Sequence, residues 1–366
     1  MIRRALLPSL AVLALAACTV PPPKTMPQPA ATSPPVVPPP PAPVEHVRDF
    51  SAARAEFVRS TSQRFGIPAE QIEAVLAQAQ IRDSIIKAMS RPAEAKPWRD
   101  YRLIFIQPKR IDGGRAFLAE HRDALQRAED KYGVPKEIIT AILGVETSYG
   151  GNKGSYLVVD ALYTLAFAYP RTGDPAKLER ENKREAFFRD ELAQLFALGK
   201  EQGFDIGTLK GSYAGAMGWG QFMPSSYRDY AVDGDGDGRV DLFNDLDDVF
   251  ASVANYFAMK GKWERGGPVM QRALRDLGAA DFVNPGNSVT LDQSFASLAA
   301  AGYRPAATAA ASQPITLITL DGVAGPEYWI VYNDFKAITT YNISRLYATA
   351  VYQLAESIAG RDPDPQ

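Results

Sequence analysis

The segment IITAILGVETSYGG, residues 138–151, has the pattern of a buried helix with one carboxylate on its apolar face. If Pro135 stands at the helix start, positions 139, 142, 143 and 146 share one side, and only Glu146 among them is polar. Burial and the partial negative charge of a helix C-terminus both disfavour an ionised carboxylate, so we expect a raised pKa for Glu146. A glutamate that stays protonated near neutral pH suits general-acid cleavage of a glycosidic bond. On spacing alone, a salt-bridged glutamate at a helix end fits at least as well.

A second segment, KGSYAGAMGWGQFMPSSY at residues 210–227, is rich in small and aromatic residues. Its glycines and alanines permit close approach of backbone and ligand, while Ser212 and Gln221 offer neutral hydrogen-bonding groups. Interleaved aromatic rings are typical of sites that stack on sugar rings. The alternative is a glycine-rich structural turn, and composition alone does not separate the two.

Together the two segments resemble the membrane-bound lytic murein transglycosylase B family, whose members have a lysozyme-like core. The resemblance extends from about Trp98 to Tyr347, nearly the whole folded region. It implies that Glu146 is the single catalytic acid and base. For the matching tyrosines, burial with a satisfied hydroxyl group is the alternative. The polar and aromatic residues that it places around the substrate are Ser212, Gln221, Tyr101, Tyr256, Tyr341, Asn342 and Tyr347.

The reaction that the resemblance implies is cleavage of the β-1,4 bond between N-acetylmuramic acid and N-acetylglucosamine in peptidoglycan, with 1,6-anhydromuramoyl ends as products and no required cofactor. Most glycosidases use two carboxylates, yet Glu146 is the only acidic residue in the two segments. The sequence therefore favours ring closure by one glutamate. A muramidase that uses water and a non-catalytic peptidoglycan-binding lipoprotein are the alternatives. We expect a monomer that binds glycan strands and is able to join cell-wall enzyme complexes.

The N-terminus predicts export and a lipid anchor. Arg3 and Arg4 precede a short apolar run, residues 5–17, which is too short to span a bilayer. The run ends in Leu-Ala-Ala before Cys18, the pattern of lipoprotein processing, and this cysteine is the only one in the chain. An ordinary signal peptide followed by a chance cysteine is the alternative. Thr19, where aspartate would signal inner-membrane retention, favours an outer-membrane lipoprotein facing the periplasm of a Gram-negative cell.

Composition excludes several classes of function. Residues 21–43 are dense in proline and nearly without charge, so they predict an extended spacer between membrane and enzyme. The net charge of −2 gives no basic footprint for nucleic acid. The two histidines are His46, in the linker at 18–48, and His121. Histidine-based triads and histidine metal sites are therefore nearly excluded.

Apolar periodicity predicts an α+β fold that is mostly α-helical, with a small antiparallel β subdomain late in the chain. The family resemblance implies that the helical part contains a lysozyme-like core beside an additional helical N-terminal domain. The expected helices are 57–65, 69–87, 116–132, 135–146, 185–200, 246–260 and 344–358, the expected strands 288–291, 315–320, 328–332 and 337–340, and 171–184 is expected to be a charged surface loop. The expected domains are a signal peptide at 1–17, the lipidated linker at 18–48, a helical domain at 49–130, the lysozyme-like core at 131–285 with 341–360, and the β subdomain at 286–340.

The acidic segment DGDGDGRVD, residues 233–241, matches the first half of a calcium-binding EF-hand loop. Position 12 of that loop would be Asn244, which offers one uncharged oxygen where a bidentate glutamate is usual. A structural calcium ion is one interpretation, and turn-capping or solvated aspartates are the other. The candidate ligands are Asp233, Asp235, Asp237, Arg239 through its carbonyl group, and Asn244, with Asp241 at position 9.

Overall fold

A computed structural model describes residues 50–90, 96–286, 288–308 and 314–364. The predicted signal peptide and the lipidation site, Cys18, lie outside the described residues. Within the described part of the chain, no helix has the length and apolar character needed to cross a bilayer.

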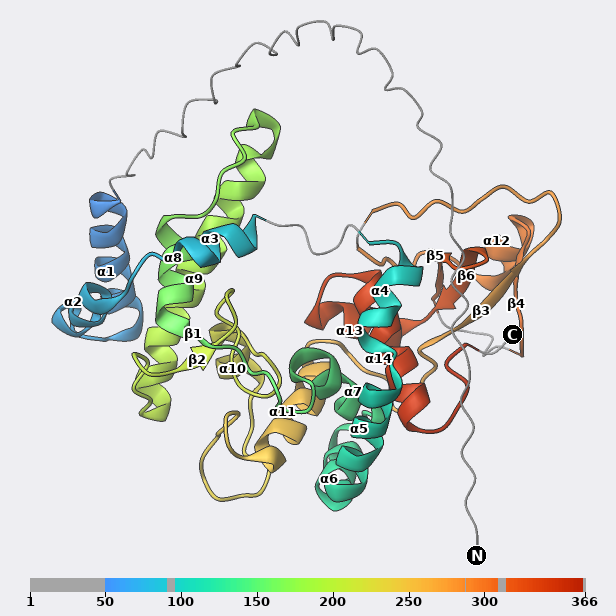
Figure 1. Cartoon of the computed structure of the whole chain (residues 1–366), viewed down its shortest axis with the longest axis horizontal. Helices are drawn as coiled ribbons and strands as arrows, with labels where there is room; N and C mark the ends of the chain where they lie inside the picture. Colours follow the sequence, from blue (N-terminus) through green and yellow to red (C-terminus); the bar gives the residue numbers. More distant parts are fainter. Residues whose placement is uncertain (1–49, 91–95, 287, 309–313, 365–366) are drawn as a thin grey trace, which may run out of the picture. The chain divides into compact units, whose positions relative to one another are not determined.

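Helices dominate the described chain (Figure 1), as the apolar spacing predicted. They are α1 (Ser51–Phe65), α2 (Ala69–Gln78), α3 (Asp83–Met89), α4 (Trp98–Phe105), α5 (Pro108–Glu120), α6 (Arg122–Tyr132), α7 (Lys136–Thr147), α8 (Val158–Phe167), the short 3-10 turn η1 (Pro175–Lys177), α9 (Leu178–Gln202), α10 (Pro224–Tyr230), α11 (Leu246–Met259), α12 (Phe295–Ala300), α13 (Asn333–Tyr341) and α14 (Arg345–Ile358). The strands are β1 (Tyr156–Leu157), β2 (Lys210–Gly211), β3 (Met270–Arg275), β4 (Tyr303–Pro305), β5 (Thr316–Gly322) and β6 (Gly325–Val331).

One helix predicted at 69–87 is two helices, α2 and α3. Side chains of α8 cause the break, because they bind the backbone of the connecting residues. Asp160 Oδ1 accepts from the N–H of Gln80 at 2.9 Å, and Thr164 Oγ1 accepts from the N–H of Arg82 at 3.0 Å. These N–H groups are satisfied without continuing the helix. The helix predicted at 116–132 is likewise divided, at His121, into α5 and α6.

The charged segment 171–184 was predicted to be a surface loop, and this is wrong for its second half. Helix α9 begins at Leu178 and continues for 25 residues. Charged residues fill its first turns without an apolar period, but Glu181 accepts hydrogen bonds from the backbone N–H and hydroxyl group of Thr172 at 3.0 and 2.7 Å. Arg171 pairs with Glu185 at 2.6 Å. Contacts across the turn, rather than periodicity, stabilise this helix start.

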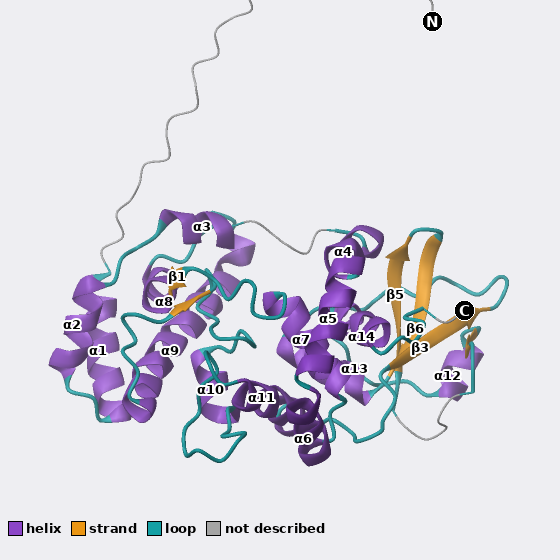
Figure 2. Cartoon of the chain, turned by 60° about the horizontal axis from the view of Figure 1, so that its bottom comes forward, coloured by secondary structure: helices purple, strands orange, loops and turns teal. Residues whose placement is uncertain are grey.

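A four-stranded antiparallel sheet, in the order β4-β3-β6-β5, lies beside the last two helices (Figure 2). The strands predicted at 315–320 and 328–332 are confirmed as β5 and β6, which form a hairpin with Gly322 paired to Gly325. Both faces of this hairpin are buried. Leu317 and Ile330 belong to a small cluster on one face, whereas residues such as Trp329 on the other face join the main core.

Two predicted strands are absent from this sheet. Ala337–Thr340 is part of α13, because Phe335, Ala337 and Ile338 are buried against neighbouring helices at helical spacing, which overrides the strand preference of isoleucine and threonine. Ser288–Leu291 forms no ladder, and only Gln293 beyond it bridges to Ile315. The sequence pattern also missed β3, whose arginines and glutamine hide its alternation, and the short β4.

The helices before residue 130 pack on those that follow it. Helix α1 contacts α9, α6 contacts α11, and α14 contacts both α4 and α5. A single main cluster of buried apolar side chains extends from Phe57 to Ile358. The contacts therefore cross the predicted boundary at residue 130, and β3 places the start of the sheet before the predicted boundary at 286.

Candidate active site

Helix α7 positions Glu146 as its sequence pattern predicted. Residues 138–144 are buried, and α7 packs against α14 and α5 (Figures 1 and 2). The helix ends one residue after Glu146, where Ser148 and Tyr149 both adopt left-handed backbone angles, with φ of 53° and 59°. Two consecutive non-glycine residues in this region are a strained arrangement, which occurs preferentially at functional sites.

The turn after Glu146 is held by contacts that require glycine at position 144. The ring of Tyr149 folds back over α7, and a Cβ on Gly144 would lie 2.6 Å from its hydroxyl oxygen. That hydroxyl group donates to the carbonyl of Arg110 at 2.9 Å, and the Arg110 guanidinium donates to the carbonyl of Gly144. Thr147 Oγ1 donates to the carbonyl of Trp219 at 3.1 Å. The position of Glu146 is thus fixed from both α5 and the 210–227 segment.

The carboxyl group of Glu146 meets the hydroxyl group of Tyr347, which donates a hydrogen bond to Oε1 at 2.5 Å. Burial raises the pKa of Glu146 to about 7, and this outweighs the Tyr347 hydrogen bond, which acts to lower it. Glu146 as a whole residue is half-buried, while protein atoms surround its carboxyl group. The raised pKa predicted from the helix pattern is therefore present, and burial is its main cause.

The four predicted tyrosines surround this carboxyl group or support its neighbours. Burial raises the pKa of Tyr347 and of Tyr341 well above their usual values, and the charge of Glu146 adds to both shifts. Tyr256 packs edge-on against Tyr341, with ring centroids 4.9 Å apart, and donates to the carbonyl of Thr340 at 2.6 Å. Tyr101, on α4, also contributes to the pKa of Tyr347. These residues come from α4, α11 and the consecutive helices α13 and α14.

The polar residues of the 210–227 segment stabilise its own turn. Ser212 Oγ accepts from the backbone N–H of Ala214 and Ala216 at 3.3 and 3.1 Å. Gln221 has a left-handed backbone, with φ of 51°, and its amide donates to the carbonyls of Gly218 and Lys153 at 3.0 and 3.2 Å. The alternative interpretation of this segment, a glycine-rich structural turn, is therefore also correct.

This segment nevertheless touches the tyrosine cluster. The Tyr341 hydroxyl group donates to the carbonyl of Gly220, directly before Gln221. Asn342 follows Tyr341 on the exposed surface, and its side chain makes no hydrogen bond within the described residues. Trp219 was not singled out in the sequence, although its ring covers Gly150, where a Cβ would approach it to 2.2 Å. The interleaved aromatic pattern was the available signal for Trp219.

Comparisons with known proteins decide the family. Residues 49–356 match the family described as Transglycosylase SLT domain. The chain belongs to the transglycosylase SLT domain family. It is similar to membrane-bound lytic murein transglycosylase B of Escherichia coli (strain K12), with 39% identity over 316 residues that cover 83% of this chain and 82% of that protein.

Solved structures agree with this transglycosylase assignment. The catenated lytic transglycosylase SltB1 from Pseudomonas aeruginosa matches with a TM-score of 0.75 and 44% identity, covering 84% of this chain and 96% of that one. The lytic transglycosylase Slt35 of Escherichia coli in complex with calcium matches with a TM-score of 0.74 and 37% identity, covering 85% and 94%. The predicted fold class is confirmed. This transglycosylase is an enzyme, so the alternative of a non-catalytic scaffold is wrong.

The acidic loop of the transglycosylase gathers carboxylates in a different set from the predicted one. Oxygen atoms of Asp233, Asp235 and Asp248 all lie within 4.8 Å of one another. Asp248, in the first turn of α11, is a group that the EF-hand pattern missed because it lies beyond the loop. Asn244 instead donates its side-chain amide to Asp241 Oδ2 at 2.9 Å. Burial, and the charge of Asp233 among others, raises the pKa of Asp248.

These acidic side chains also bind the backbone. Asp233 accepts from the N–H of Gly236 and Gly238 at 2.6 and 2.8 Å, and Asp248 accepts from Gly234 and Asp241 at 2.7 and 2.6 Å. The predicted ligand Asp237 accepts from the N–H of Arg239 at 2.8 Å. The donor set is all oxygen, and mutual repulsion of its carboxylates would be relieved by a hard divalent cation. The residues therefore fit calcium.

Proposed function

We propose that this enzyme is a lytic transglycosylase that cleaves peptidoglycan glycan strands with Glu146 as its only catalytic acid and base. In the first step, protonated Glu146 donates its proton to the oxygen between N-acetylmuramic acid and N-acetylglucosamine, and the C1–O bond breaks. The N-acetyl group of the muramoyl residue stabilises the cationic C1. The ionised glutamate then takes the proton of the C6 hydroxyl group while O6 bonds to C1, which forms a 1,6-anhydro ring and consumes no water.

The observation that carries this proposal is that, among the described residues, no carboxylate contributes to the raised pKa of Glu146. A second catalytic carboxylate in a retaining or inverting glycosidase stands roughly 5–9.5 Å away. At that separation it would raise the pKa of Glu146 by like-charge repulsion. Among the described residues, burial and the Tyr347 hydroxyl group account for the shift, and no carboxylate contributes. One glutamate that donates and then accepts a proton fits this environment.

Product analysis tests the proposal. Digestion of sacculi with the wild-type enzyme is expected to release muropeptides that end in anhydromuramic acid. Glu146→Gln keeps the size of the side chain but has no proton to donate, so release of these products should be abolished while binding to sacculi persists. Products heavier by one water in mass spectrometry would establish the muramidase alternative. Cleavage by Glu146→Gln would refute the role of this residue.

The tyrosines and amides near Glu146 are proposed to hold the sugars. Asn342 is exposed next to Tyr341 and has a side-chain amide free to bind an N-acetyl or hydroxyl group. Tyr101 is half-buried and is proposed to supply a ring face, whereas Tyr256 and Tyr347 are buried, with their hydroxyl groups on Thr340 and Glu146, and would support the site from behind. Ser212 and Gln221 stabilise the turn in which the carbonyl of Gly220 accepts a hydrogen bond from Tyr341. Substitution of Asn342 by alanine should raise KM more than it lowers kcat, and the opposite pattern would contradict a binding role.

We also propose that Cys18 carries a lipid that anchors the enzyme to the periplasmic face of the outer membrane. The related Escherichia coli protein is named as membrane-bound, and the sequence around Cys18 has the lipoprotein pattern. Radiolabelled palmitate should label the wild-type protein and fail to label Cys18→Ala. The variant should fractionate with soluble periplasmic proteins as a monomer. Membrane association of Cys18→Ala would contradict the anchor.

The acidic cluster is proposed to hold a structural calcium ion. Asp233, Asp235 and Asp248 would bind it, and the ion would fix the loop to the start of α11. Slt35 was solved in complex with calcium. Calcium should raise the melting temperature of the wild-type enzyme, and the shift should disappear in Asp235→Asn. Asp112→Asn changes an exposed aspartate on α5 and is a control that should keep the shift. Equal melting temperatures with calcium and with a chelator would exclude the site.

A further inference from the structure

Trp219 connects the turn after Glu146 to the chain that follows the acidic loop. Its carbonyl accepts a hydrogen bond from Oγ1 of Thr147, the residue directly after Glu146, at 3.1 Å. Its backbone N–H donates to the carbonyl of Leu242 at 3.0 Å. Its ring covers Gly150 so closely that a Cβ at this position would clash with it. Both the backbone and the ring of this half-buried residue therefore hold the turn.

The indole N–H of Trp219 and the ammonium group of Lys153 share one acceptor. Trp219 Nε1 donates to the carbonyl of Phe243 at 3.1 Å, and Lys153 Nζ donates to the same carbonyl at 3.2 Å. Lys153 Nζ also lies 5.2 Å from the centroid of a Trp219 ring, which is a cation–π distance. A carbonyl oxygen has two lone pairs, so it is able to accept both hydrogen bonds at once. The Phe243 carbonyl is thus a common anchor for the 210–227 segment and for the chain that leaves the turn after Glu146.

The residues around this anchor are fixed in turn by the acidic loop and α11. Asp241 Oδ1 accepts from the N–H of Phe243 at 2.8 Å, and the N–H of Asp241 donates to Asp248 Oδ2 at 2.6 Å. Gly218 packs directly on the carbonyl of Leu242, where a Cβ would lie only 2.5 Å away. Because residues 241–243 are bonded at one end and closely packed at the other, they form a preorganised support for Trp219.

The residue after Trp219 contacts the tyrosines beside the Glu146 carboxyl group. The carbonyl of Gly220 accepts a hydrogen bond from the Tyr341 hydroxyl group. The charge of Glu146 contributes to the raised pKa of Tyr341, so the two side chains interact electrostatically. A displacement of residues 219–220 would therefore affect both the turn that carries Glu146 and the packing around its carboxyl group.

We propose that Trp219 is a positioning residue for Glu146, which it keeps enclosed and aligned by holding the following turn against the Phe243 carbonyl. The proposal rests on the function proposed above, because it gives Trp219 a part in the acid–base role of Glu146. Lys153 assists by sharing the anchor. A misplacement of about 1 Å lowers the rate of an enzyme by about a hundredfold, so contacts that hold this turn affect turnover without contacting the sugar.

Two substitutions of Trp219 separate the indole N–H from the ring. Trp219→Phe keeps an aromatic ring beside Gly150 and removes the N–H. Its kcat for anhydromuropeptide release should fall about fivefold to tenfold, the change that corresponds to loss of one neutral hydrogen bond, with KM unchanged to within about twofold. Trp219→Leu also removes the ring. Water should then reach the Glu146 carboxyl group and lower its pKa from about 7, so the alkaline fall in kcat should move to lower pH.

A double-substitution experiment tests the shared anchor. Lys153→Met keeps an aliphatic stem beside Trp219 and removes the second donor. Each single variant, Trp219→Phe or Lys153→Met, leaves the Phe243 carbonyl with one of these two hydrogen bonds, whereas the double variant leaves it with neither. The kcat of the double variant should therefore lie below the product of the two single effects. Effects that simply multiply would overturn the shared anchor.

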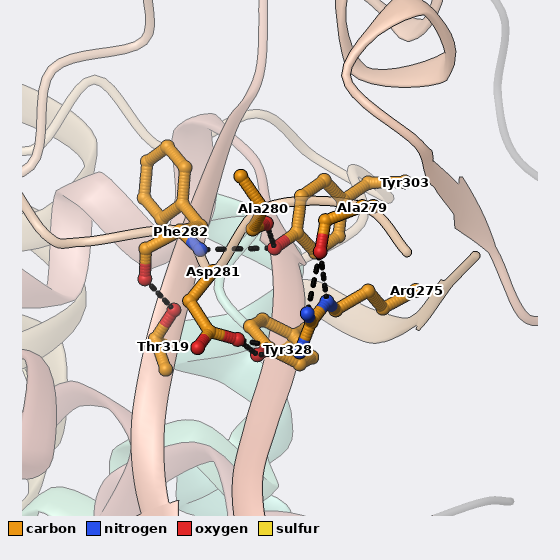
Figure 3. A network of polar contacts seen from close by, with 8 residues as sticks. All are labelled: Arg275, Ala279, Ala280, Asp281, Phe282, Tyr303, Thr319 and Tyr328. Atoms are coloured by element: carbon orange, nitrogen blue, oxygen red, sulfur yellow. Dashed lines mark hydrogen bonds and ion pairs between the residues drawn. The ribbon is translucent and has the colours of Figure 1, made fainter. Parts of the chain in front are cut away.

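Tyr303→Phe is the matched control for lost stability. In the sheet, the Tyr303 hydroxyl group donates to the carbonyl of Ala280 at 2.7 Å and accepts from the N–H of Phe282 at 2.9 Å (Figure 3). This variant also loses a hydrogen bond from an aromatic side chain to a backbone carbonyl, so its melting temperature should fall. Its kcat and pH profile should equal those of the wild type. An equal fall in kcat in Tyr303→Phe and Trp219→Phe would attribute the effect to stability and overturn the positioning role.

A binding measurement separates this proposal from the catalytic one. In the Glu146→Gln background, adding Trp219→Phe should leave the affinity for sacculi unchanged, because Trp219 acts on the carboxyl group and not on the sugar. Weaker binding would overturn the positioning role, as would a wild-type kcat in Trp219→Phe or a wild-type pH profile in Trp219→Leu. None of these results would change the role of Glu146. Cleavage by Glu146→Gln would instead refute the catalytic proposal.

Discussion

The hydroxyl group of Tyr347 hydrogen-bonds Oε1 of Glu146 at 2.5 Å, and the two residues are 201 positions apart in the chain. This contact and burial act on the carboxyl group in opposite directions. Burial destabilises the ionised form, whereas the donated hydrogen bond stabilises it. Their balance leaves a pKa of about 7. A group with this pKa is able both to give and to take a proton near neutral pH, which one residue must do in the proposed mechanism.

The first prediction concerns the pH dependence of cleavage. Because the first step needs protonated Glu146, kcat should fall as pH rises through about 7. Initial rates of anhydromuropeptide release between pH 5 and pH 9 measure this. A constant rate across that range would show that Glu146 does not supply the proton.

The second prediction concerns the hydroxyl group of Tyr347. Tyr347→Phe removes the hydrogen bond that lowers the pKa of Glu146, so the alkaline fall in kcat should move to higher pH. The free energy of unfolding at pH 8 should decrease by about 1–3 kcal/mol, because an ionised carboxylate loses its donor. At pH 5 the loss should be smaller.

Tyr132→Phe, on α6, is the matched control for Tyr347→Phe. It also removes one hydroxyl group, but this hydroxyl group makes no hydrogen bond within the described residues. Its pH profile and stability should equal those of the wild type. If Tyr347→Phe kept the wild-type pH profile, the hydrogen bond would not influence the catalytic group.

The third prediction concerns the close packing behind the catalytic turn. Gly144→Ala would place a Cβ 2.6 Å from the hydroxyl oxygen and 2.7 Å from Cζ of Tyr149. The Tyr149 ring must then move, and overpacking of this kind costs about 1–3 kcal/mol of unfolding free energy. Activity should fall as well, since the same ring holds the turn after Glu146. Chemical denaturation and initial rates measure the two effects.

Gly113→Ala is the matched control for Gly144→Ala. It also lies in a helix facing Tyr149, but its added Cβ would be 3.3 Å from the ring. The gain in helix propensity of about 1 kcal/mol should offset that tighter contact. Equal stabilities for the two alanine variants would contradict the packing argument.

The fourth prediction concerns Asp334, a fully buried carboxyl group in α13. Its Oδ1 accepts from the N–H of Glu264 at 2.8 Å, while Oδ2 has no partner among the described residues. Burial raises its pKa to about 7, whereas an unfolded aspartate titrates near about 4. The folded protein therefore holds an extra proton between these values, so its stability should fall as pH rises through this window.

Asp334→Asn keeps the acceptor for Glu264 and removes the titration. The decrease in melting temperature between pH 5 and pH 8 should be smaller in this variant than in the wild type. Asp112→Asn changes an exposed aspartate and should leave that decrease unchanged. An Asp334→Asn variant with the full wild-type decrease would show that another group causes the pH dependence.

Several features of this enzyme could be predicted because they depend on near neighbours in the chain. The run before Glu146 specifies a helix with an acidic group on its apolar side, and this predicted the direction of its pKa shift. Alternating residues at 315–320 and 328–332 likewise predicted the β5–β6 hairpin. In both cases the periodicity of side chains matches the geometry of the element that they form.

The break between α2 and α3, the helix at 333–341 and the addition of Asp248 to the acidic cluster depend instead on contacts with distant segments. Asp160 and Thr164 accept hydrogen bonds from the backbone N–H groups of Gln80 and Arg82, so α2 does not continue into α3. Burial in the core overrides the strand preference of residues 337–340. By itself, the sequence determined that Glu146 lies near the end of a buried helix, where burial disfavours ionisation of its carboxyl group. Only the tertiary structure decided that the Tyr347 hydroxyl group would contact the Glu146 carboxyl group. Hydrogen bonding and burial depend on which groups meet in space, whereas local periodicity describes one segment at a time.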